Sequence, residues 1–270
     1  MSLLDRISVL ILTFNEEPNI ARTLDALTGL REVVVLDSGS TDATAAIVAR
    51  YPNARLVVRP FDEHARQWNF GLQDCGLSGE WVLALDADYV VGPDILAEID
   101  ALTPSESMAG YAAGFRYVML GRPLRGALYP PVTVLYRRER ARYVQDGHTQ
   151  RVVVDGQVGR LDGRIDHDDR KPLKRWLASQ QRYAELEARQ LLAARPDELS
   201  RIDRIRRLGW LAPVLVFFYA LFAKGLILGG WHGWLYVLQR TAAEVMIALE
   251  IVDRRLRSAG GQSASEQASQ

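Results

Sequence analysis

Four short apolar runs, separated by segments with helical spacing, constrain the first hundred residues more than any other feature of this sequence. The runs cover residues 7–12, 33–36, 54–58 and 81–85 and are rich in Val, Ile and Leu. Runs of this kind are typical of strands buried on both faces of a sheet. Helical patterns at residues 20–30, 43–50 and 95–102 alternate with them, and Pro18 and Pro93 mark two of the helix starts. The alternation predicts an α/β fold with a mostly parallel, doubly wound sheet.

The rest of the chain divides into segments of different character. Residues 106–170 are β-like and irregular, so residues 1–170 are expected to form one domain with halves at 1–105 and 106–170. A helical, basic segment follows at 171–208; its surroundings from residue 170 to 207 hold eleven basic and five acidic side chains. Residues 209–257 read as an apolar hairpin and an amphipathic helix, and residues 258–270 as a disordered tail rich in Ser, Ala, Gly and Gln.

Composition excludes several classes of function. The 33 Lys and Arg balance the 33 Asp and Glu, which argues against a dedicated nucleic-acid binder. Cys75 is the only cysteine, so an internal disulfide framework and a Cys-based zinc site are both excluded. The first six residues lack a basic start followed by a long apolar run, and we therefore expect the chain to begin in the cytoplasm.

Polar side chains follow three of the predicted strands at the edge where ligands bind in such sheets. Thr13, Asn15 and Glu16 follow the first run, although a plain turn also explains this group. Asp37 follows the second run. After the fourth run, two carboxylates leave a buried strand two residues apart within residues 86–88, and such a pair can share one Mg²⁺ or Mn²⁺ ion. A cation there neutralises charge on a departing diphosphate.

Several familiar nucleotide and nucleophile motifs are missing from the sequence. It contains no Gly-rich dinucleotide fingerprint, no P-loop and no Gly-x-Ser-x-Gly elbow. A phosphate ligand would therefore be held mainly by metal and by basic side chains.

The chain resembles the family 2 glycosyltransferases, which have the GT-A fold. The resemblance rests on four blocks in order, at residues 7–17, 34–42, 65–71 and 81–88, and covers about the first hundred residues. The later segments 154–156, 158–161, 165–167 and 180–183 are similar to the subgroup that builds lipopolysaccharide cores and related envelope glycans. The resemblance makes residues 1–105 a nucleotide-binding half and residues 106–170 an acceptor half.

The resemblance also implies roles for the strand-end residues that contact the nucleotide. Thr13, Asn15 and Glu16 would line the base pocket. Asp37 would contact the base or the ribose, and Arg66 would approach the diphosphate or the base.

A second set of residues would hold the metal and the diphosphate. Asp86 would bind the ribose or sugar and a metal-bound water, and Asp88 would ligate the divalent ion. His167 is a further candidate for the metal or diphosphate site because neutral imidazole is a reasonable ligand. Arg170 and Lys171 are expected phosphate contacts.

Most family 2 enzymes invert the anomeric centre and need one general base. The subgroup usually places a Glu directly after a His, but Thr149 stands in that position here, and Thr cannot act as a base near pH 7. We therefore assign the base to Asp146. His148 is the alternative, as base or as a residue that orients the acceptor.

The C-terminal segments predict a membrane surface as a partner. Residues 211–223 carry no charge, and Lys224 interrupts the run before it reaches the roughly 20 residues needed to span. Basic residues flank both ends of residues 209–257, which favours a hairpin in the cytoplasmic leaflet. The final helix has one apolar stripe of seven residues with spacings of three and four, namely Leu235, Leu238, Ala242, Val245, Leu249, Val252 and Leu256. We expect the stripe to lie on lipid, on the apolar hairpin, on the catalytic domain or against a second copy in a homodimer.

We therefore predict an inverting, divalent-metal-dependent glycosyltransferase that is peripheral or monotopic at the cytoplasmic face of the inner membrane. Its donor is a nucleotide sugar and its acceptor a lipid-linked saccharide. The alternatives are sugar transfer to polyprenyl phosphate, a nucleotidyltransferase, and a non-catalytic nucleotide-sugar-binding subunit.

Overall fold

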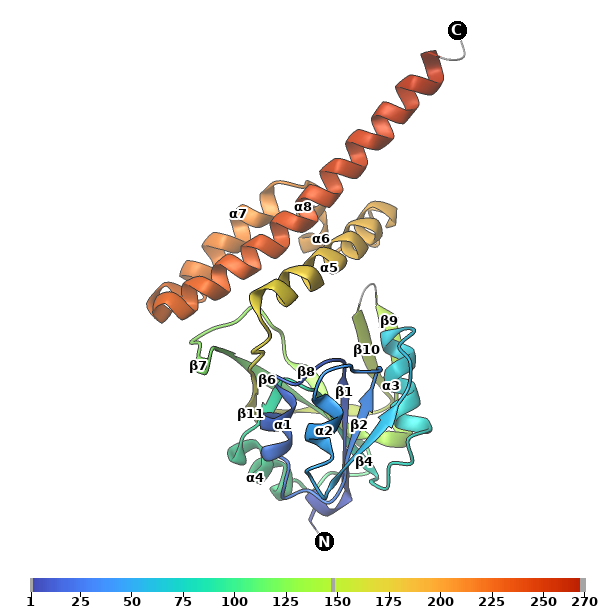
Figure 1. Cartoon of the computed structure of the whole chain (residues 1–270), viewed down its shortest axis with the longest axis vertical. Coiled ribbons are helices and arrows are strands. Elements are labelled where there is room, and N and C mark those ends of the chain that lie inside the picture. The colour runs from blue at the N-terminus through green and yellow to red at the C-terminus, as the bar shows by residue number, and fades with distance from the viewer. Residues whose placement is uncertain (1, 147–148, 268–270) are drawn as a thin grey trace. The chain divides into compact units, whose positions relative to one another are not determined.

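The computed structural model describes residues 2–146 and 149–267 and divides the chain into two compact units (Figure 1). The first unit, Met1–Lys171, is a mixed α/β domain, and the second, Pro172–Gln270, is helical. Each unit is described by itself below.

The first unit begins with a parallel half-sheet that matches the predicted strands. Strands lie side by side in the order β3-β2-β1-β4, and their neighbours are all parallel. Short helices connect or follow them. The elements of this half are η1 (Leu4–Arg6), β1 (Ile7–Thr13), α1 (Ile20–Asp25), β2 (Val33–Asp37), α2 (Thr44–Val48), β3 (Ala54–Val58), α3 (His64–Gln73), β4 (Trp81–Asp86), β5 (Tyr89–Val91) and α4 (Pro93–Ala101).

Alternate side chains of the central strands enter two separate cores, one on each face of the sheet. Val9 and Ile11 of β1 pack in a core with the helices α1, α2 and α4, whereas Leu10 packs with Trp68 and Leu72 of α3. Burial on both faces explains why β1, β2 and β4 read as continuous apolar runs. The prediction of full burial is wrong for β3, where Val58 is exposed because β3 is the edge strand.

The second half of the sheet is mixed rather than parallel. Strand β8 pairs antiparallel with both β4 and β6, and β11 pairs parallel with β6 and antiparallel with β5. A separate hairpin of β9 and β10 packs on α3, where Trp68 stacks on Tyr143 with ring centroids 5.0 Å apart. The remaining elements are β6 (Met108–Met119), β7 (Arg122–Pro123), β8 (Val132–Arg137), η2 (Arg138–Arg140), β9 (Ala141–Asp146), β10 (Thr149–Val154) and β11 (Gln157–His167).

The second unit is a set of helices around a small apolar core. Ala188, Leu191, Leu199 and Ile251 form that core. Its helical segments are α5 (Leu173–Ala193), α6 (Arg201–Arg207), α7 (Leu211–Phe218), η3 (Tyr219–Ala223), η4 (Leu226–Gly229) and α8 (Gly230–Gln267). Helix α8 extends into residues 258–267, part of the stretch for which composition predicts disorder. An established helix is readily extended, because each residue added gains one hydrogen bond.

Helix α8 packs within its unit by a face that the apolar stripe does not include. Val237, Glu244 and Ile251 are buried, whereas Leu249 and Leu256 of the stripe are 65% and 68% exposed. The stripe therefore lies mainly on the outer side of the helix. Among the described residues no single helix qualifies as a membrane span by length and hydropathy. The segments Leu211–Ala223 and Leu226–Ser258, bent by 69°, qualify only as a pair.

Candidate active site

The carboxyl ends of three parallel strands bring the predicted polar residues to one edge of the sheet. Thr13 at the end of β1 lies opposite Asp37 at the end of β2, and Leu12 lies opposite Asp86 at the end of β4. The chain returns to this edge at the end of β11, where the Asp168 amide donates to the carbonyl of Asp88 over 2.9 Å. This contact places residues 167–171 beside the carboxylate pair.

Asp86 and Asp88 share a buried environment with opposed effects on their ionisation. Burial and the charge of Asp88 raise the pKa of Asp86. Burial also opposes ionisation of Asp88, but the charges of His167 and Lys171 outweigh it and lower the pKa of Asp88. Asp88 is therefore the stronger acid of the pair.

Two basic side chains face Asp88. His167 Nε2 lies 3.4 Å from Asp88 Oδ2, and Lys171 Nζ lies 3.9 Å from the same oxygen. Burial lowers the pKa of His167, but the charges of Asp88 and Asp86 outweigh it, so the net shift is upward. Its Nδ1 atom is buried and has no hydrogen-bond partner among the described residues.

Glu16 also joins this cluster, and its contact with a nucleotide base stays a prediction. Its Oε1 lies 2.7 Å from Lys171 Nζ. Burial raises the pKa of Glu16, Lys171 opposes the shift, and the charge of Asp88 adds to it. The structure thus brings Glu16, Asp86, Asp88 and His167 together around Lys171.

The fully buried side chain of Asn19 ties the loop after β1 to the chain that follows β11. Its Nδ2 donates to Glu16 and to Asp169, at 2.9 Å each, and its Oδ1 accepts from the Arg170 amide over 2.9 Å. Arg22 completes the connection through an ion pair of 3.2 Å with Asp168. Sequence reasoning missed Asn19 because its partners Asp169 and Arg170 lie 150 and 151 positions away in the chain.

The predicted phosphate contact Arg170 is also part of this connection. Its guanidinium donates to both carboxylate oxygens of Asp168, at 2.7–3.2 Å. Its contact with a diphosphate stays a prediction.

Thr13, Asn15 and Asp37 shape the two loops at the sheet edge. Asp37 is 2% exposed, and its carboxylate accepts from Thr13 Oγ1, from the amides of Gly39 and Ser40, and from Ser40 Oγ. Asn15 has a positive φ of 55°, and its Oδ1 accepts from the Thr41 amide over 2.7 Å. These residues hold the loops together, and their contacts with base or ribose stay predictions.

Arg66 lies on α3 with its side chain 69% exposed. Its guanidinium pairs with Glu63 at 3.0 Å and with Asp62 at 3.8 Å. Its role at the diphosphate stays a prediction.

Three tyrosines surround the other side of His167. The ring centroids of Tyr117 and Tyr89 lie 4.4 and 5.2 Å from that of His167, and Tyr129 lies at 6.1 Å. The hydroxyls of Tyr89 and Tyr129 are 3.1 Å apart. Burial, together with the charge of Asp86, raises the pKa of both phenols, so both remain neutral at physiological pH.

The predicted base lies at the tip of the β9–β10 hairpin. Asp146 ends β9 and pairs with Thr149 at the start of β10. His148 lies outside the described residues, as does the side chain of Asp146, so the choice between them stays open. The body of the hairpin is fixed to α3, because the Asn69 side chain bonds both the amide and the carbonyl of Tyr143 at 2.8 and 2.9 Å.

The residues at the sheet edge fit a divalent cation that arrives with a phosphate ligand. Among the described residues, no group of three His, Cys, Asp or Glu side chains is arranged to hold a metal. However, two ligand atoms on one Mg²⁺ ion with bonds of about 2.1 Å lie about 3 Å apart, and the 3.4 Å between Asp88 and His167 approaches this spacing. Mg²⁺ commonly takes one or two carboxylates and completes its shell with water and substrate phosphates.

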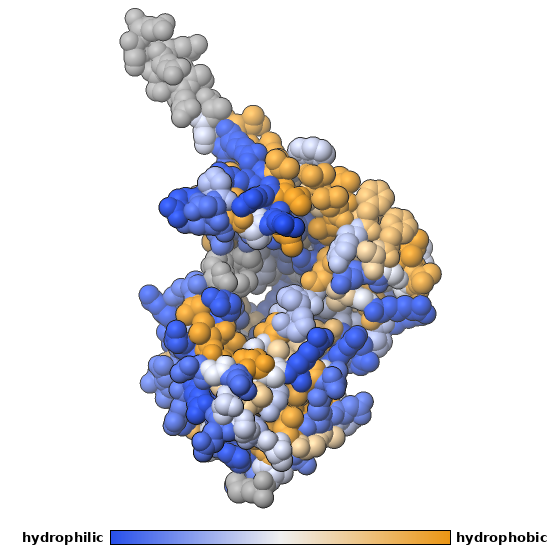
Figure 2. Space-filling model, turned by 180° about the vertical axis from the view of Figure 1, so that it is seen from behind, coloured by the Kyte–Doolittle hydropathy of each residue, from blue (hydrophilic) through white to orange (hydrophobic). Residues whose placement is uncertain are grey.

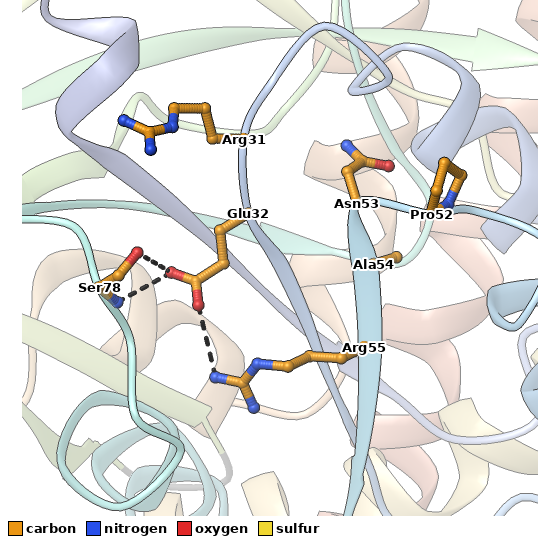
Figure 3. Close-up of a pocket in the computed structure, with 7 residues that line it drawn as sticks. All are labelled: Arg31, Glu32, Pro52, Asn53, Ala54, Arg55 and Ser78. Atoms are coloured by element: carbon orange, nitrogen blue, oxygen red, sulfur yellow. Dashed lines mark hydrogen bonds and ion pairs between the residues drawn. The ribbon is translucent and has the colours of Figure 1, made fainter.

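A surface pocket at the opposite edge of the sheet has a structural explanation (Figure 3). Glu32 there accepts from the amide and hydroxyl of Ser78, at 2.9 and 2.8 Å, and pairs with Arg55 at 3.6 Å. The pocket lies near the amino ends of β2, β3 and β4, away from the acidic cluster. Its lining residues are Arg31, Glu32, Pro52, Asn53, Ala54, Arg55 and Ser78.

Comparisons with known proteins identify related sequences and structures. Residues 8–120 match the model of the family "Glycosyl transferase family 2". The lipopolysaccharide core biosynthesis glycosyltransferase LpsC of Rhizobium meliloti is 27% identical over 92% of this chain and 92% of its own length. An uncharacterized glycosyltransferase of Rickettsia conorii is 34% identical over 42% of this chain and 39% of its own.

Among solved structures, S. aureus TarS 1–349 in complex with UDP-GlcNAc aligns over 94% of this chain and 92% of that chain. Its sequence identity is 18% and its TM-score is 0.42. The family model covers the strands that carry the acidic pair, and the LpsC match extends over nearly the whole chain. The family match over residues 8–120 and the similarity to LpsC support a family 2 glycosyltransferase that uses a nucleotide-sugar donor.

Proposed function

We propose that this enzyme moves a sugar, with inversion, from a nucleotide-diphosphate donor to a hydroxyl of a lipid-linked envelope glycan. One observation carries the proposal: Asp86 and Asp88 leave a buried strand at the ligand-binding edge and face Lys171 and His167. Asp88 and His167 would hold Mg²⁺ or Mn²⁺, and Asp86 would bind the sugar or ribose and a metal-bound water. The bound ion would neutralise charge that develops on the departing diphosphate.

A single displacement accounts for inversion. The acceptor hydroxyl attacks the anomeric carbon, the bond from that carbon to the diphosphate oxygen breaks, and the nucleoside diphosphate leaves with the bonding electrons. We assign removal of the hydroxyl proton to the carboxylate of Asp146, with His148 as the alternative. The similarity to LpsC, named for lipopolysaccharide core biosynthesis, supports an envelope glycan as acceptor.

A membrane surface is the proposed location of the reaction, at the cytoplasmic face of the inner membrane. Apolar side chains gather on the helices of the second unit (Figure 2). Trp231, Leu228 and Phe222 are 87%, 69% and 59% exposed, an arrangement that costs free energy in water unless a partner covers it. Basic side chains of α6 and the later part of α8 flank these segments and suit an anionic lipid surface. A homodimer through the exposed stripe of α8 is the competing arrangement.

Asp88→Asn tests the chemical part of the proposal. We expect turnover in a nucleotide-sugar hydrolysis assay with Mn²⁺ to fall about 100-fold or more, because a neutral amide is a poor ligand for a hard cation. Asp100→Asn, on the exposed face of α4, is the matched control and should keep wild-type turnover. Unchanged turnover of Asp88→Asn, with unchanged dependence on Mn²⁺, would refute the assignment.

The base requires a separate comparison. Asp146→Asn should lower turnover strongly while donor affinity changes little, since the carboxylate acts on the acceptor. If His148→Ala were inactive and Asp146→Asn normal, the base would be His148 instead.

A further inference from the structure

Lys171 places a positive charge inside the acidic cluster of the donor site. Its ammonium lies 2.7 Å from Glu16, 3.6 Å from Asp169 and 3.9 Å from Asp88, and its side chain is only 18% exposed. Burial disfavours the charged amine, but the charges of Asp88 and Glu16 outweigh this and raise the pKa of Lys171. Lys171 is therefore fully charged at neutral pH.

The backbone around Lys171 is held by hydrogen bonds, whereas its side chain is a chain of single bonds held by ion pairs at its end. The Lys171 amide donates to Asp169 Oδ1 over 3.0 Å, and Asn19 holds both Asp169 and the preceding amide of Arg170. By contrast, the ammonium sits at the end of a flexible four-carbon stem. The same anchored residue can therefore place its charge on the carboxylates or turn it toward another anion within reach.

A divalent cation and this ammonium compete for the same carboxylate. Both need the negative charge of Asp88, and the attraction of unit charges about 4 Å apart is several times stronger near a protein than in bulk water. The described residues also lack a preformed group of three metal ligands. Metal alone should therefore bind weakly while Lys171 occupies the cluster.

We propose that Lys171 is the counter-ion of the donor-free site: it neutralises the carboxylates that receive the divalent cation and moves to the diphosphate when metal and donor bind. This inference rests on the proposed metal role of Asp88. This role makes metal binding and donor binding mutually dependent. Bound metal releases the Lys171 ammonium for the diphosphate, and bound diphosphate draws the ammonium away from the carboxylates that receive the metal.

The inference predicts opposite effects of one substitution on two ligands. Lys171→Met should bind Mn²⁺ alone about tenfold more tightly than the wild type, measured by electron paramagnetic resonance of free Mn²⁺, because the competing charge is gone. The same variant should bind a nucleoside diphosphate about tenfold more weakly in saturating Mn²⁺, measured by calorimetry with UDP, GDP and ADP. A residue with only a structural role would lower both affinities.

Two controls keep the outcomes separate. Lys174→Met removes an exposed lysine three residues away and should match the wild type in both titrations. Lys171→Gln, which is neutral but can still bond Glu16, provides the same test if Lys171→Met does not fold.

These titrations distinguish a failure of the counter-ion role of Lys171 from a failure of the metal role of Asp88. Mn²⁺ affinity that is unchanged or weaker in both Lys171 variants would overturn the counter-ion role, even where Asp88→Asn lowers Mn²⁺ affinity and so supports the proposed metal site. If adding Asp88→Asn to Lys171→Met left the tight Mn²⁺ site intact, the metal role of Asp88 would fail, and the counter-ion inference would fall with it.

Discussion

Removing three exposed apolar side chains from the second unit should release the enzyme from membranes. Phe222, Leu228 and Trp231 are 59%, 69% and 87% exposed, so replacing all three with Ser removes little internal packing. Their exposed apolar area is about 400 Å², given side-chain areas of about 150–250 Å² for aromatic residues. At about 25 cal/mol per Å², complete burial in lipid would contribute about 10 kcal/mol.

Partial insertion still leaves a large effect. If lipid covers only a third of this area, the triple variant loses about 3 kcal/mol, which is more than 100-fold in the membrane partition coefficient. Co-sedimentation with vesicles containing roughly one-third anionic lipid measures this coefficient. Wild-type protein should also stay partly bound in high salt, because salt screens charge but does not weaken apolar insertion.

A matched control uses exposed apolar residues of the first unit. Val58, Phe61 and Leu120 are 62%, 49% and 68% exposed, and replacing them with Ser should leave vesicle binding unchanged. Equal binding of the two triple variants would refute insertion of the second unit. Wild-type protein that ignored vesicles and formed a dimer by light scattering would instead assign the apolar surface to a second copy.

Three further substitutions test how the fold is held. Glu32→Gln should cost about 1–2 kcal/mol at pH 7 in urea unfolding. Burial raises the pKa of Glu32, but hydrogen bonds from Ser8 and Ser78 outweigh it and give a net lowering. The contribution is therefore fully present above about pH 4.5, and the difference from wild type should be lost as pH falls through the lowered pKa of the folded state. Glu244→Gln should cost about 3 kcal/mol, since Glu244 is 2% exposed and its loss leaves Arg206 with the longer ion pair to Glu187 at 3.4 Å. Asn19→Ala should cost about 2–4 kcal/mol and increase hydrogen exchange at residues 168–171, and unchanged exchange would contradict its role as the anchor.

The first half of the fold could be predicted because a local sequence pattern marks each of its strands. Each strand of the parallel core is a short apolar run bounded by polar residues, and the last residue of each run marks the sheet edge. The ends of these runs predict that Thr13, Asp37 and Asp86 share that edge, and the register of β1, β2 and β4 confirms it. Helix α3 could also have been found, since Ala65, Trp68 and Leu72 are buried at spacings of three and four.

The rest of the site depends on pairings that no local pattern specifies. Lys171 meets Glu16 across 155 positions of sequence, and only the return of β11 between β5 and β6 brings them together. That return includes a shift of register between Arg160 and Arg164. A bulge of this kind changes which residues reach the edge, and its position does not follow from apolar periodicity.

For helix α8, apolar periodicity did not predict which face packs inward. The apolar stripe that includes Leu249 is genuine, but the helix packs within its unit by another face that contains Ile251 and the charged Glu244. The spacing of apolar residues cannot assign an inward face when a helix has two apolar sides. The buried face includes an acid because Arg206 reaches it with paired hydrogen bonds.

The charge balance of the donor site explains why a lysine belongs there. Glu16, Asp88 and Asp169 gather at an edge where burial makes uncompensated negative charge expensive, by several kcal/mol for each isolated ion. Under the proposed mechanism, a metal that binds together with the diphosphate would not offset this cost between turnovers. The compensation must therefore come from the chain itself, and it must be removable, which a flexible ammonium at Lys171 permits and a rigid bidentate guanidinium would permit less readily. On this reasoning the same contact both stabilises the empty enzyme and couples the binding of the metal to that of the diphosphate.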